Sequence, residues 1–152
     1  MAGLASRFSR RGGLATHPSC PIMPLMLYSP LCMLLTMDAV EVVATDEFSG
    51  WYGDLDDADR ENVQVKVDLL QSAGVALGHP NSSAIEGCRY AIRELRIQSK
   101  GRPLRVFYAF DPRRNAVLLL GGDKTGLTDQ RFYGEYVPKA ERIWEDYLEE
   151  TK

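Results

Sequence analysis

Three consecutive segments in which apolar residues alternate with period two, joined by very short connections, constrain this fold more than any other feature. The connections are residues 99–102 and residues 111–115, and both contain turn-forming residues. Connections this short join antiparallel neighbours, because a parallel pair needs a long crossover. We therefore expect an antiparallel meander of three strands, at about 90–98, 103–111 and 115–121.

The residues before the meander predict one strand and two helices. Residues 40–44 are apolar and β-branched, and Thr45 or Asp46 offers an N-cap for a short helix that ends near Leu55. Acidic residues at 56–59 favour the start of a second helix, which we expect to end at about residue 77. Helical spacing predicts a buried stripe of Val63, Val67 and Leu70, with Gln64 and Lys66 off it.

Strands and helices fall in separate runs along the chain, which is typical of an α+β fold. Residues 78–83 are expected to form a loop, and Pro138 to Leu148 a terminal helix. We expect the helices on one face of an antiparallel sheet, so the other face would be available to a ligand.

The first 37 residues differ in composition from the rest of the chain. All five methionines and four of the eight prolines lie there. Three interpretations compete: an export signal, a membrane-surface anchor, or a start codon assigned too far upstream, so that Met37 opens the protein. We favour the last, which makes residues 1–36 a non-native or disordered extension and residues 37–152 the working domain.

The cysteine pattern indicates neither a disulfide framework nor a metal centre. The three cysteines form no CxxC pair and have no histidine at a zinc-binding spacing. We therefore expect a reducing, cytoplasmic environment and no metal.

A formal net charge of −3 conceals a strong segregation of charge along the chain. Residues 38–88 carry two basic and 11 acidic residues, whereas residues 89–131 carry ten basic and four acidic residues. The basic segment coincides with the predicted meander. A nucleic-acid contact is therefore plausible for the sheet.

The four-residue loop at 99–102 fixes the register of the first hairpin and places Arg96 directly opposite Arg105. Like charges at such a position are destabilising, so an anion or a neutralising neighbour is expected. Glu94, two residues along the same face, could neutralise the pair, which would make this an ordinary solvated surface. Phe107 shares the arginine face and could stack a base.

Four motifs from residue 94 onward, together with the opening strand and the acidic helical pair, resemble the RelE/ParE toxin superfamily and, within it, the phage-related HigB-like branch. They are Glu-Leu-Arg at 94–96, Gly-Arg-Pro-Leu-Arg-Val at 101–106, Phe-Asp-Pro-Arg-Arg at 110–114 and Leu-Leu-Leu-Gly-Gly-Asp-Lys at 118–124. The resemblance implies a type II toxin that cleaves mRNA in the ribosomal A site without metal or cofactor. It also implies a cognate antitoxin, often of helix-turn-helix type, and no membrane partner.

The resemblance assigns catalysis to Arg105, Lys124 and Tyr133, with Tyr136 as the competing tyrosine. In this chemistry the ribose 2′-oxygen attacks the adjacent phosphate, and positioned cations stabilise the charge that develops. Further RNA or phosphate contacts are expected from Arg93, Arg96, Phe107 and Arg131.

Two other functions fit the same fold, because a fold does not fix a function. One is a ParE-like inhibitor of DNA gyrase, and the other is a nonenzymatic module that binds nucleic acid or a protein partner. The cationic residues themselves have structural alternatives: Arg105 pairing only with Glu94, Lys124 capping a strand, and Tyr133 packing beneath the last helix.

Overall fold

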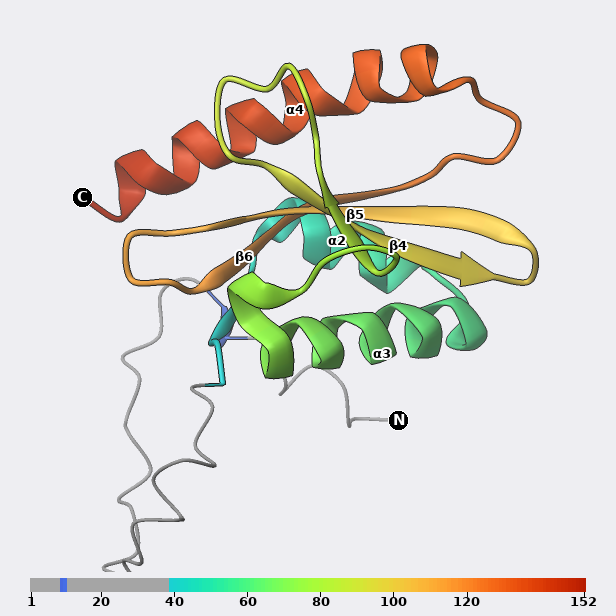
Figure 1. The fold of residues 1–152 in the computed structure, drawn as a ribbon, viewed down its shortest axis with the longest axis horizontal. Coiled ribbons are helices and arrows are strands. Elements are labelled where there is room, and N and C mark those ends of the chain that lie inside the picture. The colour runs from blue at the N-terminus through green and yellow to red at the C-terminus, as the bar shows by residue number, and fades with distance from the viewer. Residues whose placement is uncertain (1–8, 11–38) are drawn as a thin grey trace, which may run out of the picture.

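A six-stranded sheet organises the chain in the computed structural model, which describes residues 9–10 and 39–152 (Figure 1). The spatial order is β1-β2-β6-β5-β4-β3. The strands are β1 (Ser9–Arg10), β2 (Val42–Ala44), β3 (Ser82–Ala84), β4 (Arg93–Ser99), β5 (Arg102–Phe110) and β6 (Ala116–Asp123).

The predicted meander is confirmed, since β4, β5 and β6 are antiparallel neighbours. The first strand differs from the expectation, because β2 pairs with β6 in parallel and the sheet is therefore mixed. The extension predicted at residues 1–36 lies outside the described residues, apart from β1, which pairs with β2.

The predicted helical pair is α2 (Asp46–Asp54) and α3 (Asp57–Ala73), and each begins at a side-chain cap. Thr45 accepts a hydrogen bond from the Phe48 backbone at 3.3 Å and donates to the carbonyl of Leu119 on β6 at 2.8 Å. Asp56 caps α3 by accepting from the backbone of Asp59 at 2.9 Å. The start of α2 is therefore fixed to the centre of the sheet.

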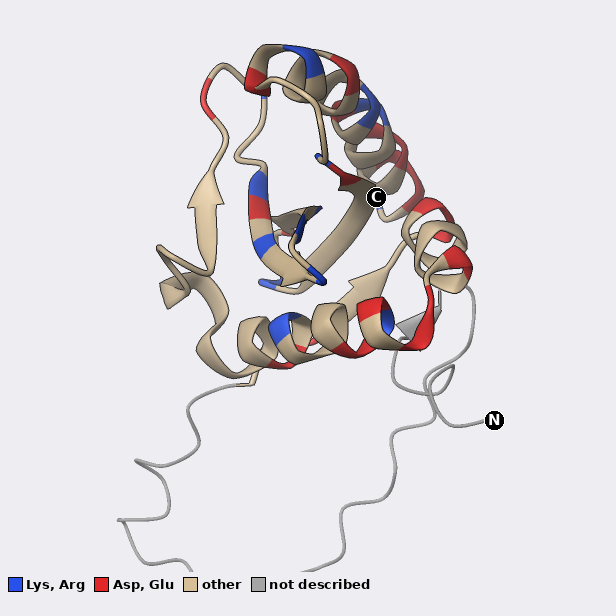
Figure 2. Ribbon diagram, turned by 90° about the vertical axis from the view of Figure 1, so that its right-hand side faces the viewer, with Lys and Arg blue, Asp and Glu red and all other residues tan. Residues whose placement is uncertain are grey.

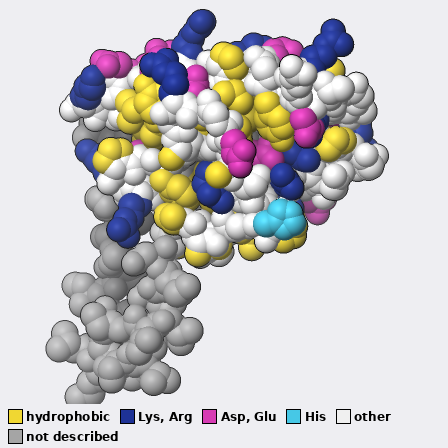
Figure 3. Space-filling model, turned by 45° about the horizontal axis from the view of Figure 1, so that its top comes forward, with side chains coloured by type: hydrophobic (Ala, Val, Ile, Leu, Met, Phe, Trp, Pro, Cys, Tyr) yellow, Lys and Arg dark blue, Asp and Glu magenta, His cyan; other side chains and the backbone are white. Residues whose placement is uncertain are grey.

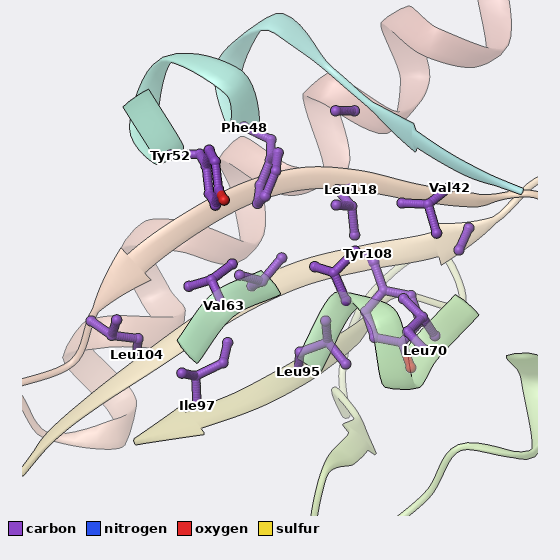
Figure 4. Close-up of a cluster of buried hydrophobic side chains, with 14 of the residues drawn as sticks. Val42, Phe48, Tyr52, Val63, Leu70, Leu95, Ile97, Leu104, Tyr108 and Leu118 are labelled. Atoms are coloured by element: carbon purple, nitrogen blue, oxygen red, sulfur yellow. The ribbon is translucent and has the colours of Figure 1, made fainter. Parts of the chain in front are cut away.

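One face of the sheet packs against this helical pair, and Figure 4 shows the buried side chains that meet there. Phe48 and Tyr52 come from α2, and the predicted stripe of α3 is fully buried. Alternate residues of the strands complete the layer: Leu95, Ile97, Leu104, Val106, Tyr108 and Leu118.

The opposite face is covered by a single long helix, α4 (Asp129–Glu150), so the expectation that this face is open is wrong (Figure 1). A second apolar layer fills the space between α4 and the sheet, formed by Ile92, Phe107, Ala109, Val117, Leu119, Phe132, Ala140, Trp144 and Tyr147. The α+β, RelE-like class is confirmed, with helices in two layers rather than one.

The terminal helix begins nine residues before the predicted start at Pro138, which lies inside it. An internal proline costs about 3 kcal/mol because it removes a hydrogen bond and clashes with the preceding turn. Thr128 supplies the N-cap, and the buried stripe that begins at Phe132 continues past the proline to Tyr147. This continuous buried face outweighs the local signal. None of the helices in residues 39–152 is long and apolar enough to cross a membrane.

Three smaller expectations are also corrected. The helix expected to end at about residue 77 stops at Ala73, and a single 3₁₀ turn, η2 (Gly74–Ala76), follows it. Gln64, expected off the buried stripe, is buried. Its amide group is satisfied there, since it accepts from the Tyr52 hydroxyl at 3.5 Å and donates to Asp68 at 2.8 Å. The loop predicted at 78–83 contains the start of edge strand β3, where Ser82 hydrogen-bonds the Tyr108 hydroxyl at 2.5 Å.

Candidate active site

Arg96 on β4 lies directly opposite Arg105 on β5, as the hairpin register predicts. Both side chains leave the sheet on the α4 face, since their neighbours Leu95, Leu104 and Val106 enter the other layer. The pair is therefore placed by backbone register, which a slip of one residue would destroy.

Glu94 supplies the negative charge between the two arginines, and only 2% of its side chain is exposed. Its Oε1 accepts from Arg96 Nε at 3.1 Å and from the Ser83 hydroxyl at 3.1 Å. Its Oε2 accepts from the Tyr133 hydroxyl at 2.7 Å and lies 3.8 Å from Arg105 Nε. A buried carboxylate thus connects β3, β4, β5 and α4. Glu94 neutralises the pair, as one of the two interpretations of the sequence held, but it does so from a buried position and not on a solvated surface.

The Arg105 side chain is held tightly, with 11% of it exposed. One terminal nitrogen donates to the carbonyl of Leu104 at 3.0 Å, and Nε is buried without a hydrogen-bond partner among the described residues. Arg96 is more accessible, with 39% of its side chain exposed. The two arginines therefore present one fixed and one adaptable guanidinium on the same face.

Tyr133, on the second turn of α4, joins the cluster of Glu94, Arg96 and Arg105 from the helix that covers this face of the sheet. Burial, followed by its hydrogen bond to Glu94, raises the pKa of Tyr133 to about 12. The hydroxyl is therefore neutral at physiological pH and donates its proton towards Oε2. Tyr133 lies under Lys124, whose Nζ is 5.2 Å from the centre of the ring.

Lys124 follows β6 and pairs with Asp129 in the first turn of α4. This ion pair is the first cause of a lowered pKa at Asp129, and Arg105 and Arg96 lower it further by charge attraction. The exposed carboxylate of Asp129 therefore lies in the field of all three cations. The neighbouring Asp123 does not hold Lys124, because it accepts from Arg102 at 2.9 Å.

Two of the expected RNA contacts, Arg93 and Phe107, cannot reach a ligand at this cluster, and Arg131 is exposed beside it. Arg93 belongs to the opposite face and donates to the Leu77 carbonyl at 3.2 Å and to the Tyr108 hydroxyl at 3.3 Å. Phe107 is fully buried against Phe132, so it cannot stack a base in this conformation. Arg131 is exposed near the start of α4, two residues from Tyr133, and its role is open to test.

The competing tyrosine, Tyr136, is part of the packing layer. Its ring stacks on Phe107 with a centroid distance of 6.0 Å and lies directly over Gly122. A Cβ at Gly122 would come within 2.5 Å of that ring, and a Cβ at Gly121 within 2.1 Å of Trp51 on α2. The two glycines of the last motif therefore admit one aromatic ring to each face of the sheet.

A second ionic network fixes the hairpin to α3. Arg102 donates to Asp59, which is 3% exposed, and to Asp123, the residue before Lys124. Ser99 also donates to Asp59 at 2.5 Å, and Lys100 pairs with Asp56. The acidic helix thus anchors both ends of the hairpin loop and the strand end that carries Lys124.

The view from the side of the sheet shows basic positions on the central strands and many acidic positions on the surrounding helices (Figure 2). With the α4 side tilted forward, basic and acidic side chains are interspersed with apolar ones over the surface (Figure 3). On this face the basic side chains therefore do not form a broad positive surface, because carboxylates lie among them.

Sequence reasoning missed three members of the cluster: the buried state of Glu94, the hydroxyl of Ser83 and the carboxylate of Asp129. The hairpin register pointed to Glu94, because it shares the face of Arg96. Ser83 lies in the unpredicted strand β3, and Asp129 lies in the part of α4 that precedes the predicted start at Pro138. Neither carried a signal of its own.

The sheet order, the helical pair on one face and the single helix over a cationic cluster define a RelE-like α+β protein. The model of the family described as phage derived protein Gp49-like (DUF891) matches residues 50–145. The chain therefore belongs to this family, the phage-related and HigB-like branch of the RelE/ParE superfamily that its motifs resemble.

Two relatives from Mycobacterium tuberculosis agree with this assignment. The protein described as "Putative toxin HigB2" is 35% identical over 112 residues, which is 70% of this chain and 55% of that protein. The protein described as "Putative toxin HigB3" is 33% identical over 108 residues, which is 70% of this chain and 92% of that protein. The match thus spans about half the length of the first relative. No solved structure matches the chain.

Proposed function

We propose that this chain is the toxin of a type II toxin–antitoxin pair and that it cleaves mRNA on the ribosome in the cytoplasm. The observation that carries the proposal is the convergence of Arg96, Arg105 and Lys124 around Tyr133 on one sheet face. The printed descriptions of both relatives as toxins support the first part.

The cluster suits the attack of a ribose 2′-oxygen on the adjacent phosphate. Guanidinium groups offer planar pairs of donors to phosphate oxygens, and charge develops on those oxygens as the new bond forms. Arg105 holds the scissile phosphate from within the sheet, and Arg96 closes on it from the more exposed side. Arg131, exposed on the same helix as Tyr133, contacts the RNA backbone further along the strand.

Lys124 acts on the leaving group of the reaction, and Tyr133 acts on the nucleophile. The Lys124 ammonium stabilises the departing 5′-oxygen and gives it a proton. The Tyr133 hydroxyl orients the 2′-hydroxyl by hydrogen bonding. The two side chains are neighbours, since Lys124 Nζ lies 5.2 Å from the centre of the Tyr133 ring. This chemistry requires no metal or cofactor, which is how the proposal differs from metal-dependent nucleases.

We further propose that a cognate antitoxin, of helix-turn-helix type, holds the protein inactive. Expression of the full chain without antitoxin should then arrest growth and stop translation. Primer extension on total mRNA tests the reaction, and new 5′ ends within open reading frames are expected. Growth arrest with intact mRNA and blocked DNA supercoiling would instead establish a ParE-like gyrase inhibitor.

A further inference from the structure

The hydrogen bond from Tyr133 to Glu94 gives the buried carboxylate a direct connection to the site. Oε2 accepts from the Tyr133 hydroxyl at 2.7 Å, whereas the nearest arginine nitrogen, Arg105 Nε, is 3.8 Å away. Oε1 is occupied by Arg96 and Ser83. The two carboxylate oxygens of Glu94 therefore have different partners: Oε1 binds side chains of the sheet, and Oε2 binds the Tyr133 hydroxyl.

Neither group can act as the base alone. Glu94 has 2% of its side chain exposed, so an RNA 2′-hydroxyl cannot reach it. Tyr133 is only partly buried, but its pKa, raised to about 12, leaves almost no tyrosinate near neutral pH. A tyrosine that must take a proton under these conditions has to release its own at the same time.

We propose that Glu94 is the terminal proton acceptor of the cleavage reaction and that Tyr133 relays the proton to it. This inference rests on the ribonuclease function proposed above. The 2′-oxygen passes its proton to the Tyr133 oxygen while the Tyr133 proton moves to Oε2. The bond from the 2′-oxygen to phosphorus forms, the bond to the 5′-oxygen breaks, and the Lys124 ammonium protonates that oxygen.

The proton count closes over one cycle. The products are a 2′,3′-cyclic phosphate and a free 5′-hydroxyl, with Glu94 protonated and Lys124 neutral. The site is reset when the proton returns from Glu94 through the Tyr133 hydroxyl to solvent and Lys124 takes up a proton from solvent. Tyr133 is neutral before and after the step, and Glu94 acts on the substrate only through it.

The charged and titratable groups that face Glu94 come from every element around it. Arg96 is on β4, Arg105 on β5 and Tyr133 on α4, and the Ser83 hydroxyl lies on β3. Lys124 and Asp129 lie beyond Tyr133. Glu94 and Asp129 are the two carboxylates among these groups, so an Asp129 variant is a necessary control for the pH profile.

The test is single-turnover cleavage of mRNA on programmed ribosomes by the full-length chain. Glu94→Gln keeps an acceptor for the Tyr133 hydroxyl but cannot take its proton, so we expect a rate about 100-fold lower. The concentration of ribosome complex at half-maximal rate should be unchanged or lower. The rise of the rate with pH, seen when a base loses its proton, should vanish in Glu94→Gln and persist in Asp129→Asn and Glu135→Gln.

Tyr133→Phe tests the relay from its accessible end and does not depend on the folding of the Glu94 variant. Its cleavage rate should fall by the same factor as that of Glu94→Gln, and the double variant should cleave no more slowly than either single variant. Glu94→Asp should recover part of the rate and the pH dependence. Wild-type rate and pH profile in Glu94→Gln or Tyr133→Phe, or multiplied losses in the double variant, would overturn the relay.

The same assay distinguishes failure of the proposed ribonuclease function from failure of the relay. If the wild-type chain cleaves no mRNA in this assay, the proposed ribonuclease is wrong, and the relay falls with it. If the wild type cleaves and the variants match it, only the relay is wrong.

Discussion

Arg96 and Arg105 face each other across β4 and β5, and a single buried carboxylate, Glu94, lies beside both. Like charges at directly opposed positions of a sheet are unfavourable by themselves. The fold keeps this pair by placing the compensating charge beside it on the same face, two residues from Arg96 on β4. The arrangement leads to the first prediction.

Arg105→Ala should abolish growth arrest and slow cleavage by at least about 100-fold, because a charge-stabilising donor is lost at the phosphate. It should also lower the unfolding free energy by about 1–3 kcal/mol, since Glu94 loses a partner in a buried site. Arg113→Ala, exposed in the turn between β5 and β6, is the control and should leave both quantities unchanged. Persistent toxicity in Arg105→Ala, or lost antitoxin binding, would disprove the assignment.

Gly122→Ala should destabilise the fold by about 1–3 kcal/mol, because the added methyl group overlaps the Tyr136 ring. The same change at Gly121 should have a similar effect through Trp51. Gly134, inside α4, has nothing within 4 Å of an added Cβ, so Gly134→Ala should stabilise by about 0.5–1 kcal/mol. Urea unfolding measures all three, and equal midpoints for Gly122→Ala and the wild type would contradict the packing.

Asp129→Asn should increase affinity for a phosphodiester, because its carboxylate pairs with Lys124 and lies in the field of both arginines. The expected gain is roughly twofold to fivefold, the scale of an exposed ion pair. Binding of a non-cleavable RNA with a 2′-methoxy group at the scissile position measures it. Glu135→Gln, which breaks an exposed pair with Lys139 on the same helix, should bind as the wild type does. Weaker binding in Asp129→Asn would show that this carboxylate does not compete with phosphate.

Tyr133 should stabilise the fold only while it is protonated. Its pKa is raised from 10.0 to about 12, so the folded state holds the proton more tightly than the unfolded chain does. The contribution is therefore fully present below about pH 10 and is lost as the pH rises through 12. The difference in unfolding free energy between the wild type and Tyr133→Phe should shrink over this interval. A constant difference would mean that folding does not raise the pKa of Tyr133.

The strands and their register could be predicted because short turns and alternation fix both at once. The length of the hairpin loop alone assigns Arg96, Arg105 and Glu94 to one face, and the observed pairing agrees. The extent of α4 could not be predicted, because Pro138 gives a strong local signal to begin a helix, whereas the buried stripe that overrides it depends on a sheet distant in sequence.

Side-chain burial was the other limit. Phe107 shares the phase of the arginines, and alternation alone cannot say which residues of one face are covered. The first half of α4 covers Phe107 and leaves Arg96 accessible, so one face is divided into a packed part and a reactive part. Arg93 and Arg96 both belong to the basic segment, so charge alone does not distinguish them. Their spacing of three residues within one strand does, because it places Arg93 on the opposite face of the sheet from Arg96.

The pairing of Asp56 and Asp59 on α3 with Lys100 and Arg102 in the hairpin has a kinetic consequence. These partners are 44 and 43 residues apart, and they join the most acidic part of the chain to the most basic part. Unfolded segments of opposite charge attract over about 10 Å at moderate salt, before any apolar surface is buried. Refolding should therefore slow as sodium chloride is added, while unfolding of the packed protein changes little.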